Sequence, residues 1–204
     1  MKIKNIIFDF GGVLIHWDPD LVYKHYFKNS EAKILFYNET KIFDLNKQLD
    51  KGLPFSEGLA SLVEQFPHYE EAIWHWKNSW IHMIGGEIEE STAILKELHK
   101  NKYNLFGLTN WSHETLPLVI NKYEFFSFFS DIVVSGTEKH IKPEIEIYQI
   151  LLNRNNLDVE SCLFIDDHVA NIKAAESLGI KSILFKNPRQ LRNELQTLNI
   201  LNKY

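Results

Sequence analysis

The chain has 204 residues, of which 45% are hydrophobic and 24% are charged, a composition typical of globular proteins that excludes the disordered and fibrous classes. Its formal net charge is -5, its isoelectric point is near 6.0, and no cluster of Lys and Arg stands out along it. We therefore expect no nucleic-acid partner, because a phosphate backbone is bound through concentrated positive charge.

The N-terminal run MKIKNIIFDFGGVLI is apolar but is interrupted by Asp9. It is too short to span a membrane, and no small-residue cleavage site follows it. We expect a cytoplasmic protein that does not interact with membranes.

Short apolar runs bounded by turn signals then alternate with helical patterns, which is typical of a parallel sheet wrapped by helices. The expected strands are residues 4–8, 104–108, 131–134, 162–165 and 182–185. The expected helices are residues 88–101, a stretch after Ser112, and residues 145–153, 169–178 and 189–198. Right-handed crossovers between such strands predict an α/β fold with a doubly wound, Rossmann-like parallel sheet.

The interval from residue 16 to residue 87 breaks this rhythm. It contains no convincing buried strand, only amphipathic segments at residues 20–28, 31–37, 56–66 and 70–84. Asp18 before Pro19 is typical of a helix start, and Gly85 with Gly86 is typical of a helix end. We predict a small α-helical domain at residues 16–87, inserted into a core domain formed by residues 1–15 and 88–204.

Polar side chains follow four of the five expected strands. In chain order they are Asp9, Thr109 with Asn110, Lys142, and Asp166 with Asp167. Because open parallel sheets bind ligands beyond the carboxyl ends of their strands, we expect these side chains to meet at one edge. Each has an ordinary explanation when taken alone, as a turn, a surface loop or a helix cap. Their occurrence at successive strand ends favours a shared site.

This set of residues suits phosphoryl transfer. The carboxylate of Asp9 can attack phosphorus and form an acyl phosphate. A magnesium ion held by carboxylates would offset the repulsion between Asp9 and a phosphate. Lys142, the Thr109 hydroxyl and the main-chain amides around Gly11 and Gly12 could bind the phosphoryl oxygens.

Four segments, FDFGGVL, LTN, IKPEIEIY and FIDDHVANIKAAESLGI, resemble in order and spacing the four motifs of the haloacid dehalogenase superfamily. The helical insert is similar to the cap of the branch that includes 2-haloacid dehalogenases, sugar-phosphate phosphatases and the N-terminal domain of soluble epoxide hydrolase. Within that branch, the first and fourth motifs most resemble those of the bacterial glucose-1-phosphate phosphatase type. The resemblance implies a hydrolase with a Rossmann-like core, a cap, a magnesium cofactor and a small phosphorylated metabolite as substrate.

Carried over residue by residue, the resemblance makes Asp9 the nucleophile and a metal ligand. The carbonyl of Gly11 and the carboxylate of Asp167 become further metal ligands, and Asp166 acts through a metal-bound water. Thr109 and Lys142 keep the phosphate-binding roles given above. Asn110 binds substrate with Gly11 and Gly12, and Asn171 is a supporting residue.

One position departs from the family pattern. Most phosphatases of this superfamily carry a second Asp two residues after the nucleophile, and here that position is Gly11. That Asp protonates the leaving group, so the sequence leaves the general acid undefined. We expect either a preference for substrates with good leaving groups or a substitute from a nearby histidine, His16 or His113.

Two other functions stay open on the sequence. A metal-independent 2-haloacid dehalogenase would use the same nucleophile, and Thr109, Asn110, Lys142 and Tyr148 loosely resemble its site. The adjacent carboxylates Asp166 and Asp167 argue against it, because they would repel an anionic substrate. A catalytically weak binding domain is the other alternative.

The predicted cap is rich in aromatic residues that could contact a sugar. The candidates are Trp17, Trp74, Trp76, Trp80 and His82. Trp76 and Trp80 are four residues apart and could equally pack in the core of the cap. The sequence gives neither the substrate nor the oligomeric state.

Overall fold

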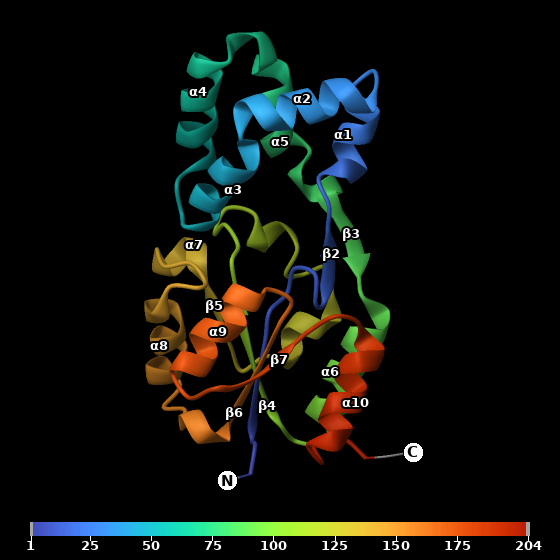
Figure 1. Ribbon diagram of the computed structural model, residues 1–204, viewed down its shortest axis with the longest axis vertical. Helices are drawn as coiled ribbons and strands as arrows, with labels where there is room; N and C mark the ends of the chain where they lie inside the picture. Colours follow the sequence, from blue (N-terminus) through green and yellow to red (C-terminus); the bar gives the residue numbers. More distant parts are fainter. Residues whose placement is uncertain (1, 203–204) are drawn as a thin grey trace.

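The computed structural model describes residues 2–202, and its centre is a five-stranded parallel sheet with strand order β5-β4-β1-β6-β7 (Figure 1). The strands are β1 (Asn5–Phe8), β4 (Asn104–Thr109), β5 (Asp131–Val134), β6 (Cys162–Asp166) and β7 (Lys181–Leu184). Ile7 of β1 lies opposite Phe106 on one side and Phe164 on the other. The predicted α/β fold with a parallel sheet is confirmed.

Helices cover both faces of this sheet. On one face lie α8 (Ile145–Arg154) and α9 (Val169–Ser177), and on the other lie α6 (Glu89–Lys100) and α10 (Pro188–Thr197). All four residues of β1 are therefore buried, and alternate side chains enter the two separate cores. Within residues 2–202, no helix has both the length and the apolarity needed to cross a bilayer.

The inserted segment folds into helices packed above the carboxyl edge of the sheet (Figure 1). They are α1 (Asp20–Tyr26), α2 (Ser30–Thr40), α3 (Ile42–Asp50), α4 (Phe55–Gln65) and α5 (Glu70–Asn78). Their core is aromatic: the Tyr23 ring stacks on Phe36 with centroids 5.4 Å apart, and Trp76 is fully buried beside them. The helix α3 is absent from the sequence prediction. It follows α2 through a single left-handed residue, Lys41 with φ 50°, where no Gly or Pro indicates a break.

Two local expectations were wrong. The interval expected to hold no buried strand begins and ends in a partly exposed two-stranded antiparallel ribbon, β2 (Ile15–Trp17) with β3 (Ile84–Glu87), where a helix end was expected at Gly85 and Gly86. Both strands are too short to show a periodic pattern, and Gly85 and Gly86 lie within β3 rather than at a helix end. The helix expected after Ser112 is only a 3-10 turn at Leu116–Leu118, which contains Pro117, a residue with no main-chain N–H to donate.

Hydrogen bonds attach the end of α3 and the loop after it to the core. The Ser135 hydroxyl donates to the carbonyl of Asp50 at 2.5 Å, and the Lys139 ammonium donates to the carbonyl of Gly52 at 2.9 Å. Ser135 begins α7 (Ser135–Glu138), the short helix after β5. These contacts place the last turn of α3 directly above the carboxyl ends of the sheet strands.

Candidate active site

The Lys142 side chain joins residues from three strand ends. Its Nζ lies 2.9 Å from Asp9 Oδ1 and 2.7 Å from Asp166 Oδ2, and it donates to the carbonyl of Leu108 at 2.7 Å. Asp9 follows β1, Asp166 ends β6 and Leu108 lies in β4, so the sheet topology assembles the cluster. Lys142 is 3% exposed, which leaves its ammonium dependent on these oxygen partners.

The loop that carries Lys142 is held by Asn110. The main-chain N–H of Lys142 donates to Asn110 Oδ1 at 2.8 Å, and Asn110 Nδ2 donates back to the Lys142 carbonyl at 3.0 Å. This reciprocal pair fixes the orientation of the Asn110 amide and the position of the Lys142 backbone. Asn110 also lines the cavity described below, whereas Thr109 is buried at the end of β4.

The two adjacent carboxylates differ in their surroundings. Asp166 is completely buried and accepts hydrogen bonds from the His168 main-chain N–H at 2.7 Å and from Asn171 Nδ2 at 3.0 Å. Asn171 is itself held through its main-chain carbonyl, which accepts a hydrogen bond from the Tyr148 hydroxyl at 3.0 Å. Asp167 is exposed to the cavity. Asp166 is therefore fixed by the protein, while Asp167 faces the space where a ligand would lie.

The electrostatics of the cluster show an excess of negative charge. Burial raises the pKa of Asp9 to about 7, Lys142 opposes this increase, and repulsion from Asp166 adds to it. Burial and repulsion from Asp166 also raise the pKa of Asp167. Burial lowers the pKa of Lys142, but attraction to Asp9 and Asp166 outweighs it, so the lysine stays protonated. Three carboxyl groups thus share one ammonium.

The donor set fits a hard divalent cation. Asp9, Asp166 and Asp167 each offer a carboxylate oxygen, and these oxygens lie within 4.8 Å of one another. Oxygen-only ligands are those that magnesium prefers. Gly12 lies beside this group with φ +74°, and a Cβ there would collide with Asp167 Oδ2. The positive φ and this close approach to Asp167 both favour glycine at position 12.

A cavity of about 310 Å³ opens over the cluster. Its walls come from the sheet edge and from the insert: Asp9, Gly11, Gly12, Trp17, Asn46, Asp50, Trp80, Asn110, Trp111, Asp167, His168 and Asn171. An adjoining cavity of about 750 Å³ shares six of these residues and includes Lys142. The space suits a small molecule.

The structure separates the candidate aromatic residues of the insert. Trp17 and Trp80 line the cavity, whereas Trp76 is buried in the aromatic core. Trp74 and His82 are absent from the walls of either cavity. Likewise, neither wall contains His16 or His113, the two candidate proton donors.

Four lining residues were missed by the sequence analysis, namely Asn46, Asp50, Trp111 and His168. Asn46 and Asp50 lie on α3, the helix that was not predicted, so no placement could be given to them. Their spacing of four residues was the available signal, because it puts two polar side chains on one helix face. Trp111 and His168 each follow a predicted site residue by one position and could have been found there.

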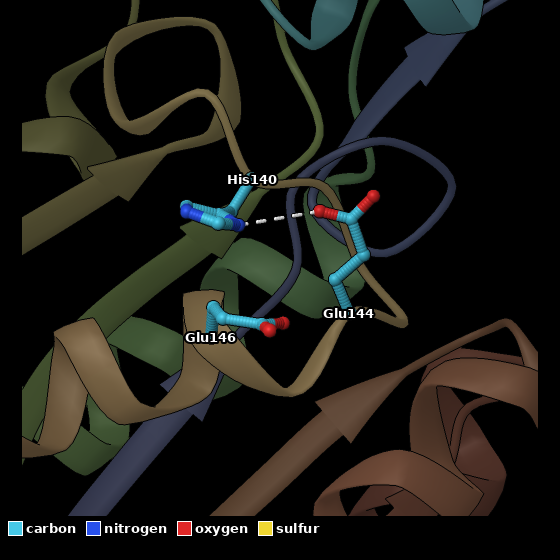
Figure 2. Close-up of side chains that lie close together, drawn as sticks. All are labelled: His140, Glu144 and Glu146. Carbon is cyan, nitrogen blue, oxygen red and sulfur yellow. Dashed lines mark ion pairs between the residues drawn. The ribbon is translucent and has the colours of Figure 1, made fainter.

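A second group of possible metal ligands lies on the loop around Lys142. Figure 2 shows the His140 imidazole facing the Glu144 carboxylate, with Glu146 extending from the start of α8. His140 Nδ1 lies 3.4 Å from Glu144 Oε2, which also accepts from the Ile141 main-chain N–H at 3.2 Å. The other Glu144 oxygen pairs with Lys51 of the insert at 2.5 Å. Glu144 thus braces the Lys142 loop against the insert.

A Rossmann-like core with a buried Asp–Lys–Asp cluster at the carboxyl edge of its sheet defines an α/β enzyme. The family model described as haloacid dehalogenase-like hydrolase matches residues 6–185, and the chain belongs to this family. The resemblance found in the sequence is confirmed.

The relatives include named phosphatases. The D-ribitol-5-phosphate phosphatase of Bacteroides thetaiotaomicron is 24% identical over 96% of this chain and 98% of its own length. A crystal structure of a haloacid dehalogenase (HAD) family enzyme from the same bacterium, a magnesium complex, is 26% identical with a TM-score of 0.72, covering 92% of this chain and 95% of that one. A predicted HAD-like family hydrolase from Porphyromonas gingivalis has the same fold, with a TM-score of 0.75 at 22% identity over 100% of both chains.

Proposed function

We propose that this hydrolase is a magnesium-dependent phosphatase that cleaves a small phosphomonoester, such as a sugar phosphate, through an aspartyl-phosphate on Asp9. The observation that carries the proposal is the cluster of three carboxyl groups around Lys142, with Asp9 and Asp167 both lining a cavity. Such an excess of negative charge suits a site that holds a cation and then a phosphate. The phosphatases among the relatives support the same function.

In this proposal each residue of the cluster has a separate task. Asp9 attacks phosphorus, and the ion pair with Lys142 holds its carboxylate in place while the ammonium neutralises developing charge. Asp167 and the Gly11 carbonyl bind the metal directly, and Asp166 supports it from its fixed position. Bound magnesium would supply the positive charge that lets an anionic nucleophile approach a phosphate. Gly12 and Asn110 contact the phosphoryl group, with Thr109 beneath them.

We further propose that residues 16–87 act as a cap domain that closes over the phosphate and selects the substrate. The insert supplies Trp17, Asn46, Asp50 and Trp80 to the cavity wall. Tryptophan faces pack against the apolar faces of sugars and related polyols, while polar groups bind their hydroxyls. Closure would also exclude water from the aspartyl-phosphate until the leaving group departs.

The two alternative functions fit the cluster less well. A metal-independent dehalogenase gains nothing from Asp166 and Asp167, whose charges would repel its carboxylate substrate. Tyr148, one of the residues that suggested such a site, donates instead to the main-chain carbonyl of Asn171. A binding domain without turnover would not require a buried Lys142 directed at Asp9.

The test is release of inorganic phosphate from a panel of phosphorylated metabolites, with and without magnesium. We expect magnesium-dependent turnover by the wild type, and a loss of at least about a thousandfold in Asp9→Asn, which lacks the nucleophile. Asp44→Asn, an exposed change on α3, is the control and should keep full activity. Halide release from 2-haloacids without metal would support the dehalogenase instead, and magnesium binding without any turnover would support the binding domain.

A further inference from the structure

The phosphatase chemistry proposed above needs a proton that its cluster does not supply. When the P–O bond of an alkyl phosphate breaks, the departing oxygen would leave as a strongly basic alkoxide unless an acid protonates it. Gly11 carries no side chain, and a Cβ built on it would meet nothing within 4 Å. Asp9, Asp167 and Lys142 are already assigned to the phosphate and the metal. The donor must therefore come from another part of the cavity wall.

Asp50 is the carboxyl group that the insert places in this wall. It is the last residue of α3 and lines both adjoining cavities together with residues from the sheet edge. Its main-chain carbonyl accepts from the Ser135 hydroxyl at 2.5 Å, which fixes the end of α3 on the core. The side chain thus has a defined position relative to Asp9, although the two residues belong to different parts of the fold.

The orientation of the Asp50 carboxyl is also fixed. Asn46 Nδ2 donates to Asp50 Oδ2 at 2.8 Å, and the Trp76 indole donates to Asn46 Oδ1 at 3.3 Å, which determines which end of the Asn46 amide faces Asp50. The main-chain N–H of Ser112 also hydrogen-bonds the carboxyl. A turn of the insert and the loop after β4 therefore hold the group from two sides.

The surroundings keep Asp50 protonated near neutral pH. Burial raises its pKa to about 8, against the opposing effect of hydrogen bonds from Ser112 and Asn46. Its place at the carboxyl end of α3 acts in the same direction, because the helix dipole disfavours a negative charge there. The charged and titratable groups around the two cavities are Asp9, Asp167, His168 and Lys142 from the core and Lys47 and Lys51 from the insert.

We propose that the Asp50 carboxyl group is the proton donor to the leaving group, a task performed from the insert because position 11 has no side chain. This inference rests on the proposed phosphatase function. As Asp9 forms its bond to phosphorus and the P–O bond to the leaving group breaks, the Asp50 proton moves to the departing oxygen and gives a neutral alcohol. Asp50 is left as a carboxylate. Water then attacks phosphorus and gives a proton to Asp50 as the bond between phosphorus and the Asp9 oxygen breaks. This releases phosphate, frees the Asp9 carboxylate and restores the carboxylic acid of Asp50.

The test compares the wild type with Asp50→Asn, which keeps the shape of the side chain but cannot donate an acidic proton. The substrates are p-nitrophenyl phosphate, whose leaving group needs little protonation, and phenyl phosphate, whose leaving group is more basic. Single-turnover release of the phenol with magnesium and excess enzyme isolates the first step. We expect a loss of about a hundredfold or more on phenyl phosphate and a much smaller loss on p-nitrophenyl phosphate. Asp44→Asn, on the exposed side of the same helix, should match the wild type on both.

A pH profile and an infrared spectrum separate proton donation from a structural role. In the wild type, release from phenyl phosphate should decline as pH rises through the pKa of Asp50, and the variant should lack that decline. The protonated-carboxyl band of Asp50 at neutral pH should disappear in Asp50→Asn, a readout that does not depend on turnover. Equal losses on both esters, no loss on either, or the selective loss in His168→Gln instead would overturn the assignment of Asp50. Failure of the wild type to release phosphate from any ester would overturn the phosphatase function with it.

Discussion

Lys142 and Asp9 form a buried ion pair of 2.9 Å at the point where the central strand of the sheet ends. The same ammonium also pairs with Asp166, so a single positive charge holds two carboxylates that would otherwise repel each other. This ion pair serves the stability of the fold as well as the proposed catalysis. Without Lys142, either carboxylate would be an uncompensated buried charge.

Removal of the ammonium should therefore destabilise the protein. Lys142→Met keeps most of the side-chain volume, and we expect it to lower the free energy of unfolding by about 3–5 kcal/mol at neutral pH, the cost of breaking a buried ion pair. Urea unfolding monitored by circular dichroism measures this. Lys47→Met, which breaks the exposed pair with Asp44, is the control and should change little. A stability equal to that of the control would contradict the role given to Lys142.

Magnesium should stabilise the folded protein through Asp167. A ligand at a hundred times its dissociation constant adds about 2.7 kcal/mol to the free energy of unfolding. We expect a magnesium-dependent rise in the melting temperature of the wild type and its loss in Asp167→Asn. Glu146→Gln, in the second group of possible ligands, should keep the full rise. If Glu146→Gln abolished it instead, the cation would bind beside His140.

The sequence predicts the core well because the signals for its strands lie in short, continuous stretches of the chain. Buried parallel strands appear as short apolar runs, and the topology brings their polar ends together, so the amino-acid pattern alone suffices to group Asp9, Asp166 and Lys142. In the insert, Trp17 and Trp80 were candidates from the sequence, but Asn46 and Asp50 could not be placed, since the left-handed turn at Lys41 that begins α3 has no sequence signal. The placement of Asp50 depends on tertiary contacts with Ser112 and Ser135, which no periodic pattern encodes.

Gly12 should be required for cation binding rather than for folding alone. Gly12→Ala and Gly86→Ala both place alanine at a positive φ, at +74° and +105°, so each should lose about 1–2 kcal/mol of stability. Only at position 12 would the new Cβ collide with Asp167, whereas nothing lies within 4 Å at position 86. We expect Gly12→Ala alone to raise the magnesium concentration needed for half-maximal phosphate release, by about tenfold or more. Equal magnesium requirements in the two variants would show that Asp167 can move aside.

Asp50 should make the stability of the protein depend on pH in a direction opposite to that of most carboxylates. Burial raises its pKa from an ordinary value of 3.8 to about 8 in the folded state, so between these values the folded protein binds a proton that the unfolded chain has released. The contribution of Asp50 to stability is therefore complete below pH 4 and is lost as pH rises toward 8, by at most about 1.4 kcal/mol per pH unit. Asp50→Asn cannot titrate and should avoid this loss.

The variant should consequently gain stability relative to the wild type as pH rises from 5 to 8.5, and the difference should stay constant at higher pH. Urea unfolding at each pH, without magnesium, measures the difference. Asp44 offers the matched control: its hydrogen bond and charge interaction with Lys47 lower its pKa, so its effect appears only in acid. Asp44→Asn should therefore run parallel to the wild type over the whole range. A parallel curve for Asp50→Asn would mean that Asp50 is ionised in the folded protein, and a carboxylate there could not protonate the leaving group.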